Sequence, residues 1–238
     1  MVGGPDEHRV DGADAPAHGV WRFQLHQGLA FNVETLAFVK RHAPVQSVEF
    51  TNSQDALPIA PNLLNQNLKV AALDRVWVTG ITYLATDEGW LYLAGLEDLY
   101  SGERVGYAMG ERMTKNPVMQ ALIRAVATRR PAAGLICHSD RGSQYCAHAN
   151  QHLLDQFGMI ASMSRKGDCY DNASIESFWG TLKNELVHHQ RYITKQQAKD
   201  EVAEYIEMFY NRQQTQTRLG YVSPSVFTQK FYLNQLAV

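Results

Sequence analysis

The chain has 238 residues, which suits one large domain or one domain with an appendage. Its hydrophobic content of 45% and aromatic content of 10% are enough to bury a core, and they exclude a wholly disordered chain. The formal net charge of −2 excludes a general electrostatic attraction to nucleic acid, so binding to DNA would need local basic patches.

Cysteine use and hydropathy indicate the compartment. The three cysteines are odd in number and lack CxxC spacing: Cys137, Cys146 and Cys169. This favours a reduced, cytoplasmic environment, although a zinc site that also draws on His138 and His148 remains an alternative. No run of about 18 or more apolar residues occurs, and residues 1–14 are polar and acidic rather than signal-like. We therefore expect a protein without a membrane segment.

The N-terminal quarter has the weakest pattern. Residues 33–42 are its one candidate helix, and Pro58 and Pro61 predict an extended linker. We expect a poorly defined segment over residues 1–60 and assign it no function.

A strand-rich pattern starts after Leu73. Residues 75–86, 90–96 and 104–109 are rich in β-branched and aromatic residues and are separated by short turns, which predicts an antiparallel meander of three strands. A helix follows, with Pro117 near its first turn. The apolar face of that helix consists of Val118, Leu122, Ile123 and Val126.

The next elements alternate between strand and helix. Residues 134–138 and 159–163 predict two further strands, residues 149–157 predict a helix between them, and a long helix begins near Asp171. The order βββαβαβα predicts an α/β fold with a mixed five-stranded sheet and helices on both faces.

The long helix places two charged residues beside its buried face. At about 100° per residue, its sheet-facing stripe consists of Ile175, Phe178, Trp179, Leu182 and Leu186. Glu176 and Lys183 are seven residues apart and therefore lie on one side of the helix, with Gly180 between them. Asp171 or Asn172 is expected to cap the helix N-terminus.

Two more helices are expected near the C-terminus. A T-x-x-Q capping box at Thr194 starts the first. Its apolar face consists of Ala198, Val202, Tyr205, Ile206 and Phe209. Residues 211–218 predict a polar loop, and Pro224 begins a short helix that runs through Phe231. We therefore expect a core over residues 61–190 and a C-terminal helical extension, residues 191–238, packed on it.

Asp140 and Glu176 are the candidate metal ligands. Asp140 follows an apolar strand and precedes a turn, which is a common position for site residues in α/β folds; a turn-capping aspartate is the alternative. Phosphodiester chemistry uses divalent metal ions, and Mg²⁺ prefers carboxylate oxygens, so acids from different elements must converge. The pair therefore predicts a metal site for chemistry on DNA phosphodiesters.

Four basic residues near this pair are candidates for DNA contact: Lys183, Arg141, Arg165 and Lys166. Ordinary solvated surface charge is the alternative for each of them. His138 is expected to be a strand-end hydrogen-bonding residue rather than a metal ligand.

Three segments resemble one protein family. HSDRGSQY (138–145), SRKGDCYDNASIESFWGTLKNE (164–185) and YNRQQTQTRLGYVSPSVF (210–227) closely resemble the OrfB-type transposases of bacterial insertion sequences. These belong to the DDE transposase and retroviral integrase superfamily, so the resemblance implies an RNase H-like fold. It covers residues 60–232 and includes the 35-residue interval (141–175) between the two acids.

The resemblance implies Mg²⁺- or Mn²⁺-dependent cutting and joining of DNA, in which a water or a 3′-hydroxyl attacks a phosphodiester. Asp140 matches the second catalytic acid, Glu176 the third, and Lys183 a DNA-contacting lysine. The first acid belongs in a stretch that resembles WVTDITYL. Here residues 77–84 read WVTGITYL, so Gly80 stands in its place.

Gly80 predicts an impaired enzyme, because a metal pair loses its bridging ligand. Asp74 is six residues upstream and Asp98 is expected to form a turn, so neither is expected to substitute. The expected function is a transposase catalytic domain that is impaired or inactive. Two alternatives stay open: a catalytically silent DNA-binding or oligomerising protein that regulates a related transposase, and an active metal nuclease that recruits another acid.

The resemblance also implies partners and a location. We expect insertion-sequence ends and target DNA as ligands, a homo-oligomer on DNA, a helix-turn-helix partner from an upstream reading frame, and a cytoplasmic, nucleoid-associated protein. Residues 1–60 match the family's basic upstream region poorly and are expected to be truncated or read in a shifted frame. Gln214 and Gln216 stand where relatives often carry Arg and His, which predicts a weaker phosphate contact.

Overall fold

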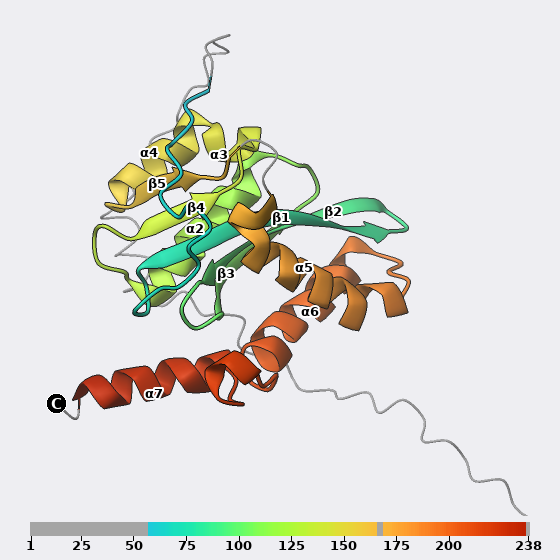
Figure 1. The fold of residues 1–238 in the computed structure, drawn as a ribbon. Coiled ribbons are helices and arrows are strands. Elements are labelled where there is room, and N and C mark those ends of the chain that lie inside the picture. The colour runs from blue at the N-terminus through green and yellow to red at the C-terminus, as the bar shows by residue number, and fades with distance from the viewer. Residues whose placement is uncertain (1–56, 166–168, 237–238) are drawn as a thin grey trace, which may run out of the picture.

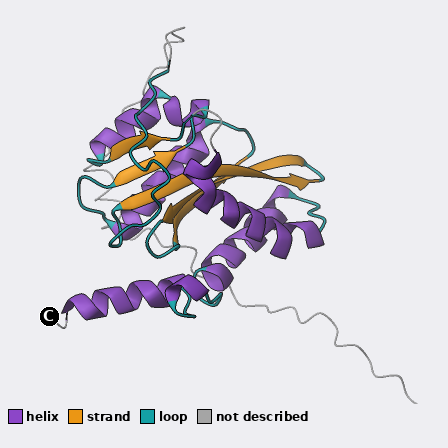
Figure 2. Ribbon diagram, in the orientation of Figure 1, coloured by secondary structure: helices purple, strands orange, loops and turns teal. Residues whose placement is uncertain are grey.

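The computed structural model describes residues 57–165 and 169–236, which form one β-sheet with helices on both faces (Figures 1 and 2). The helix expected at residues 33–42 lies outside the described residues. The strands are β1 (Val76–Thr86), β2 (Gly89–Asp98), β3 (Arg104–Gly110), β4 (Ile136–Ser139) and β5 (Ile160–Met163). Their order across the sheet is β3-β2-β1-β4-β5.

The sheet is mixed, as predicted. β1 pairs antiparallel with β2, and β2 pairs antiparallel with β3. The chain then crosses over the sheet through a helix, so β4 returns parallel to β1 and β5 runs parallel to β4. The parallel pairing of β1 and β4 brings the end of β4 beside the middle of β1.

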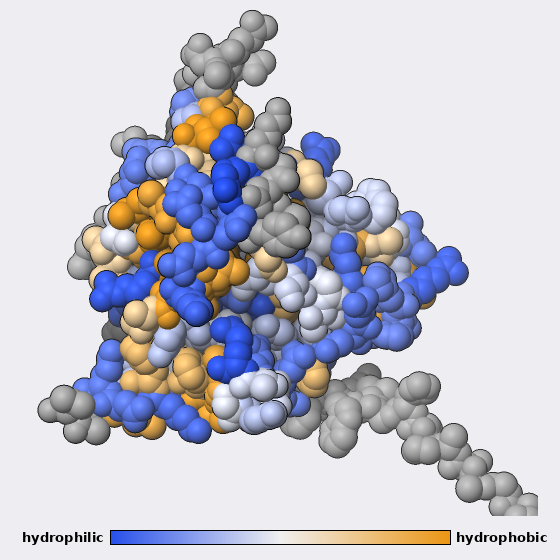
Figure 3. Space-filling view, in the orientation of Figure 1, coloured by the Kyte–Doolittle hydropathy of each residue, from blue (hydrophilic) through white to orange (hydrophobic). Residues whose placement is uncertain are grey.

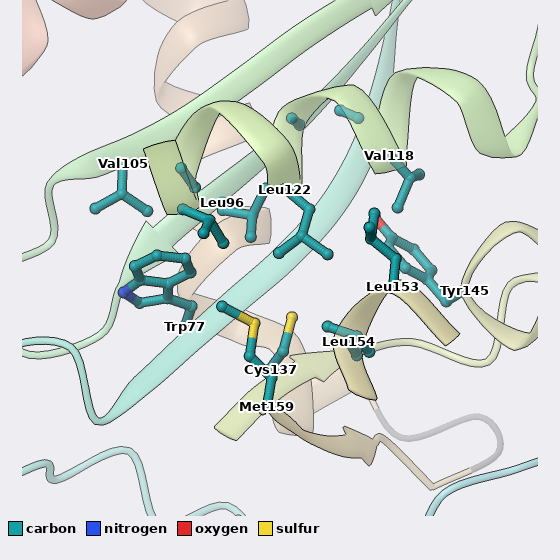
Figure 4. Packing of buried hydrophobic residues seen from close by; sticks show 14 of the residues in the cluster. Trp77, Leu96, Val105, Val118, Leu122, Cys137, Tyr145, Leu153, Leu154 and Met159 are labelled. Atoms are coloured by element: carbon teal, nitrogen blue, oxygen red, sulfur yellow. The ribbon is translucent and has the colours of Figure 1, made fainter. Parts of the chain in front are cut away.

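One face of the sheet is covered by α2 (Lys115–Arg129), α3 (Ser143–Cys146) and α4 (His148–Gln156). Figure 4 shows how Leu122 of α2 and Leu154 of α4 reach the strand residues Trp77, Leu96 and Cys137. The predicted face of α2 is confirmed for Val118, Leu122 and Val126, which are buried, and Ile123 packs partly buried against the same cluster.

The other face is covered by α5 (Ala173–Glu185), α6 (Lys195–Glu204) and the π-helical segment η3 (Tyr205–Tyr210). The predicted stripe of α5 is confirmed: Ile175, Phe178, Trp179 and Leu182 are buried, and Leu186 is partly buried. α6 begins after Thr194, whose hydroxyl accepts a hydrogen bond from the backbone N–H of Gln197 at 3.1 Å, as the capping box predicted.

The π-helical segment corrects one prediction. Phe209 was expected on the buried face, but its side chain is 41% exposed, and Tyr210 is buried in its place. A π-helical turn adds a residue to the helical repeat and so rotates the following side chains. The Tyr210 hydroxyl accepts a hydrogen bond from Arg104 Nη2 at 2.8 Å.

Arg104 joins the C-terminal helices to the sheet. Its guanidinium lies 3.9 Å from the ring centroid of Phe178, and its Nη1 lies 2.5 Å from Glu97 Oε2 within the core. That contact is an ion pair, although the two groups are not aligned as a hydrogen bond. Because both side chains are only 3% exposed, each charge depends on the other for compensation.

Three further boundaries differ from the sequence predictions. The turn expected after Asp140 is followed at once by the short helix α3, which begins at Ser143. Asn172 precedes α5, but its side chain makes no capping bond and donates instead to the carbonyl of Thr79 at 3.3 Å. The last helix, α7 (Pro224–Leu236), begins at Pro224 as expected but continues beyond Phe231 and projects from the body of the molecule (Figure 1). No helix in the described part of the chain is long and apolar enough to cross a membrane.

Candidate active site

The structure brings Asp140 and Glu176 together. Asp140 directly follows β4, Glu176 lies in the first turn of α5, and both side chains are exposed. The pKa of Glu176 is raised above its ordinary value, first by partial desolvation from neighbouring atoms and second by the negative charge of Asp140. Two carboxylates from different elements thus share one electrostatic site.

Asp140 also has the turn role that was its alternative. Its Oδ1 accepts a hydrogen bond from the backbone N–H of Gly142 at 2.8 Å. This bond fixes the carboxylate at the end of β4 and leaves its second oxygen for another partner.

Residue 80 is level with Asp140 on the neighbouring strand. The parallel register pairs Trp77 with Cys137 and Val78 with His138, and two more residues along each strand lead to Gly80 and Asp140. A β-carbon at Gly80 would point at α5, 3.1 Å from Ile175 Cγ2 and 3.1 Å from Trp179 Nε1. A side chain at residue 80 would therefore enter the space between Asp140 and the helix that carries Glu176.

The indole of Trp179 fills this space. Gly80 is paired with Gly95 on β2, and a β-carbon at Gly95 would lie 2.8 Å from Trp179 Cη2. The two glycines form a floor on which the indole lies. Trp179 Nε1 is buried and has no hydrogen-bond partner among the described residues. The glycine inside β1, which is unfavourable for a strand, thus has a packing role here.

The donor set fits one cation better than two. The described residues contain no group of three or more His, Cys, Asp or Glu side chains that could hold a metal ion. Asp140 and Glu176 offer two carboxylates, which suit a hard divalent cation that keeps several waters, but they provide too few oxygens for a metal pair.

Asp98 does not complete the set of metal ligands. Asp98 pairs with Trp77 in the β1–β2 register, near the start of β1 and three residues before Gly80. Its carboxylate accepts bonds from the backbone N–H and hydroxyl of Ser101, both at 2.8 Å, and from the backbone N–H of Asp74 at 2.8 Å. Asp98 is therefore the turn-forming residue that the sequence predicted.

A polar network supports the end of β4. His138 is fully buried, and its Nδ1 lies 2.8 Å from Ser162 Oγ, which confirms the expected strand-end hydrogen bond. Arg141 Nε donates a hydrogen bond to the carbonyl of Ser164 at 2.7 Å. This bond joins the segment that follows β4 to the segment that follows β5. Burial raises the pKa of the Cys137 thiol to about 12, which makes this residue a poor thiolate ligand for the alternative zinc site.

An ion pair fixes the approach to α5. Arg165 donates from Nε and Nη2 to the carboxylate of Asp171, each at 3.1 Å, and Asn62 Nδ2 donates to it at 2.8 Å. These bonds, led by those from Arg165, lower the pKa of the buried Asp171 to about 2. Asp171 is thus an anchor of the loop rather than a helix cap. Lys166 lies outside the described residues.

Lys183 lies against an aromatic pair that sequence reasoning missed. Its Nζ is 4.8 Å from the ring centroid of Tyr83 on β1, and Tyr83 contacts Trp90 of β2 edge-to-face, with 5.0 Å between ring centroids. The sequence signal was present: two large aromatic residues flank the turn between the first two strands.

Comparisons with known proteins agree with this fold. Two family profiles described as integrase core domain match residues 71–169 and 176–231. An insertion element IS600 31 kDa protein from Shigella sonnei is 56% identical over 182 residues, covering 76% of this chain and 67% of that protein. The transposase InsF for insertion sequence IS3A from Escherichia coli strain K12 is 39% identical over 210 residues, covering 86% of this chain and 73% of InsF.

Solved structures show the same fold at low sequence identity. The catalytic core domain of BIV integrase superimposes with a TM-score of 0.50 at 15% identity and covers 68% of this chain and 99% of that domain. A simian T-cell lymphotropic virus intasome chain gives a TM-score of 0.52 at 16% identity, with 69% and 56% covered. The fold is therefore the expected RNase H-like integrase core. The chain belongs to the insertion-sequence transposases with an integrase core domain, which are DDE-type polynucleotidyl transferases of DNA transposition.

Proposed function

We propose that this chain is a transposase catalytic core that binds DNA and holds one divalent cation between Asp140 and Glu176, and that Gly80 impairs its cleavage and strand transfer. One observation carries the proposal: Gly80 is level with Asp140 on the neighbouring strand and faces the helix of Glu176. An acid at residue 80 would enter the site between the two existing carboxylates.

The chemistry that remains follows from the residues present. Mg²⁺ or Mn²⁺ bound at Asp140 and Glu176 would polarise a phosphodiester oxygen. Burial and the negative charge of Asp140 raise the pKa of Glu176. A cation that offsets the charge of Asp140 would therefore stabilise the ionised form of Glu176. These two carboxylates alone provide no ligand for a second cation. In a two-metal site, the second cation would stabilise the other of the two oxygens, attacking or leaving, in the displacement.

DNA contact is assigned to four basic residues that are near this pair in the sequence: Lys183, Arg141, Arg165 and Lys166. Lys183 is supported best, since it lies on the side of α5 that carries Glu176. Arg141 is exposed beside Asp140, whereas Arg165 already pairs with Asp171 and is better suited to order the loop.

We propose that residues 61–190 form the catalytic core and that residues 191–238 pack on it as a helical extension. The contacts of Arg104 with Glu97 and with Tyr210 support this division. By family analogy, the chain would act on insertion-sequence ends and target DNA as a homo-oligomer, with a helix-turn-helix partner from an upstream frame, in the cytoplasm at the nucleoid.

A second function is favoured by the same incomplete site. A chain that keeps the fold and Lys183 but lacks the first acid would bind DNA or form mixed oligomers without cutting, and so regulate a related transposase.

A cleavage and strand-transfer assay separates these functions. Element-end DNA and Mn²⁺ are combined with the parent chain, with Gly80→Asp and with the neutral control Gly80→Asn. Because the indole leaves little room at residue 80, Gly80→Asp combined with Trp179→Phe is included. We expect little or no cutting by the parent and Gly80→Asn, and a gain of at least about 100-fold with the acid.

Efficient cutting by the parent, with no gain from the acid in either background, would refute the site assignment and favour a nuclease that recruits another acid. DNA binding without cutting by the parent supports the impaired core or its regulatory form.

A further inference from the structure

We propose that Tyr83 and Trp90 form a stacking platform for an unpaired DNA base, with Lys183 beside it to contact the adjoining phosphate. This inference rests on the proposed function of the chain and adds a specific binding surface to it. The platform consists of these three residues, and its ligand is a single-stranded or extruded nucleotide of the DNA bound at the candidate active site.

The two aromatic side chains are presented to solvent. Tyr83 is 49% exposed and Trp90 is 52% exposed, and both lie in the paired β1–β2 hairpin, near its turn. Their rings meet edge-to-face at 86°, and both side chains stay about half exposed in this arrangement. Bases stack on exposed aromatic rings of this kind without requiring a particular sequence.

Lys183 supplies the charge that such a platform needs. Its ammonium lies 4.8 Å from the Tyr83 ring centroid, a cation–π contact that holds the flexible side chain near the rings. A nucleotide that stacks on the aromatic pair would bring its phosphate to the same place. The combination of aromatic rings and a cation is typical of surfaces that bind single-stranded nucleic acid.

The acids near the hairpin turn already have partners. Asp87 pairs with Arg191 at 3.1 Å, and Glu88 accepts a hydrogen bond at 2.8 Å from the backbone N–H of Lys195 at the start of α6. Glu111 pairs with the Lys195 ammonium at 3.2 Å. These contacts reduce the repulsion that the acids would otherwise exert on a DNA strand.

The hairpin is also fixed in place. Thr86 forms a β-bridge with Tyr192, and the backbone N–H of Asp87 donates to the Tyr192 carbonyl at 2.9 Å. The rings therefore stand on a braced part of the sheet, and a bound base would not have to order a loose loop.

The platform lies at a usable distance from the two carboxylates. Tyr83 is three residues beyond Gly80, about 10 Å along β1, and its side chain alternates to the other side of the strand. Lys183, which contacts Tyr83, is seven residues beyond Glu176, about 10.5 Å along α5. In stacked DNA successive phosphates of one strand are about 3.4 Å apart along the axis, so the platform would reach a base about three nucleotides from the scissile phosphodiester.

The surroundings favour DNA over a second copy of the chain. On the face of the molecule seen in Figure 3, hydrophilic and neutral colours predominate over the β1–β2 side. Stable protein interfaces need a much larger continuous surface with an apolar centre. Two rings and one lysine instead match a single nucleotide.

Fluorescence of 2-aminopurine tests the platform without any catalysis. The base analogue is placed in an unpaired position about three nucleotides from the element end, which corresponds to about 10 Å at the phosphate rise of stacked DNA. Binding is measured in metal-free buffer, so that the result does not depend on cutting. Because Tyr83, Trp90 and Lys183 are not core residues, their variants should fold, and thermal melts verify this.

For the parent chain we expect quenching on binding. Tyr83→Ala and Trp90→Ala should each lose most of the quenching and bind the gapped DNA about 5- to 100-fold more weakly, whereas Tyr83→Phe should retain both. Lys183→Gln should lower the salt dependence of binding by about one phosphate contact. Tyr221→Ala is the matched control, because Tyr221 is a 72% exposed tyrosine outside the platform.

Unchanged quenching in Tyr83→Ala and Trp90→Ala overturns the platform and leaves the proposed function intact. A changed sedimentation coefficient without a change in quenching shows a protein interface and also overturns it. Failure of the parent to bind any DNA overturns both proposals, whereas failure of Gly80→Asp to cut bears only on the proposed function.

Discussion

Trp179 covers Gly80: its indole Nε1 lies 3.1 Å from the position that a β-carbon at residue 80 would take. This contact links the residue that departs from the family pattern to the helix that carries Glu176. It also means that residue 80 has become part of the packing of α5 against the sheet, and that its chemistry and its packing must be tested separately.

Gly95, the cross-strand partner of Gly80, tests the packing. Gly95→Ala would place a methyl group 2.8 Å from Trp179 Cη2, and we expect it to lower the free energy of unfolding by about 1–3 kcal/mol. Trp179→Phe should relieve part of this loss in the double variant. Gly180→Ala is the control: nothing lies within 4 Å of its β-carbon, so it should stabilise the helix by about 1 kcal/mol. Urea unfolding measures all four, and equal effects at both glycines would contradict the packing.

Asp171 predicts how stability depends on pH. Its pKa is held at about 2, below the ordinary aspartate value of 3.8, so the ionised carboxylate stabilises the folded state above pH 4. This contribution, about 2 kcal/mol, is lost as the pH falls from about 4 towards 2. Asp171→Asn should remove both the contribution and its pH dependence, as measured by urea unfolding between pH 2 and pH 7. A parallel pH profile in the variant would show that another group is responsible.

The π-helical segment predicts opposite effects for neighbouring aromatic residues. Tyr210→Phe removes the hydroxyl that accepts from the buried Arg104 guanidinium and should lower the free energy of unfolding by about 1.5–3 kcal/mol. Phe209→Leu, at an exposed position, should change it by no more than about 0.5 kcal/mol. If the order were reversed, residues 205–210 would follow the regular α-helical register that the sequence predicted.

We expect the site formed by Asp140 and Glu176 to bind a divalent cation with an affinity that falls at acidic pH. Mn²⁺ should raise the melting temperature of the parent chain, and Asp140→Asn or Glu176→Gln should remove most of that increase. The raised pKa of Glu176 means that protons compete with the cation at mildly acidic pH, so the increase should shrink as the pH falls. An undiminished increase in both variants would place the cation elsewhere.

Much of the fold could be predicted from local patterns. Strand alternation identified β1 to β3, and helical periodicity placed Ile175 and Phe178 inward and Glu176 beside them. Asp140 at the end of a buried strand was expected to meet Glu176, and their electrostatic interaction agrees with this. These successes rest on periods of two and 3.6 residues, which short windows of sequence contain.

The failures concern contacts that depend on register. The pairing of Gly80 with Gly95, which makes room for the Trp179 indole, depends on the alignment of β1 with β2. The exchange of Phe209 for Tyr210 depends on a single π-helical turn. Asp171 has the sequence signature of a helix cap, but a charged partner across the loop binds it more strongly than the helix terminus does. Local propensity does not encode such partners.

If residue 80 is the position of the missing acid, the strand-transfer rate of Gly80→Asp must exceed that of Gly80→Asn. The two variants have side chains of nearly equal size, so both strain α5 alike and differ in the carboxylate alone. We expect a rate ratio of at least about 100 with Mn²⁺ in the Trp179→Phe background. A ratio near one, with folded protein and bound DNA, would contradict it.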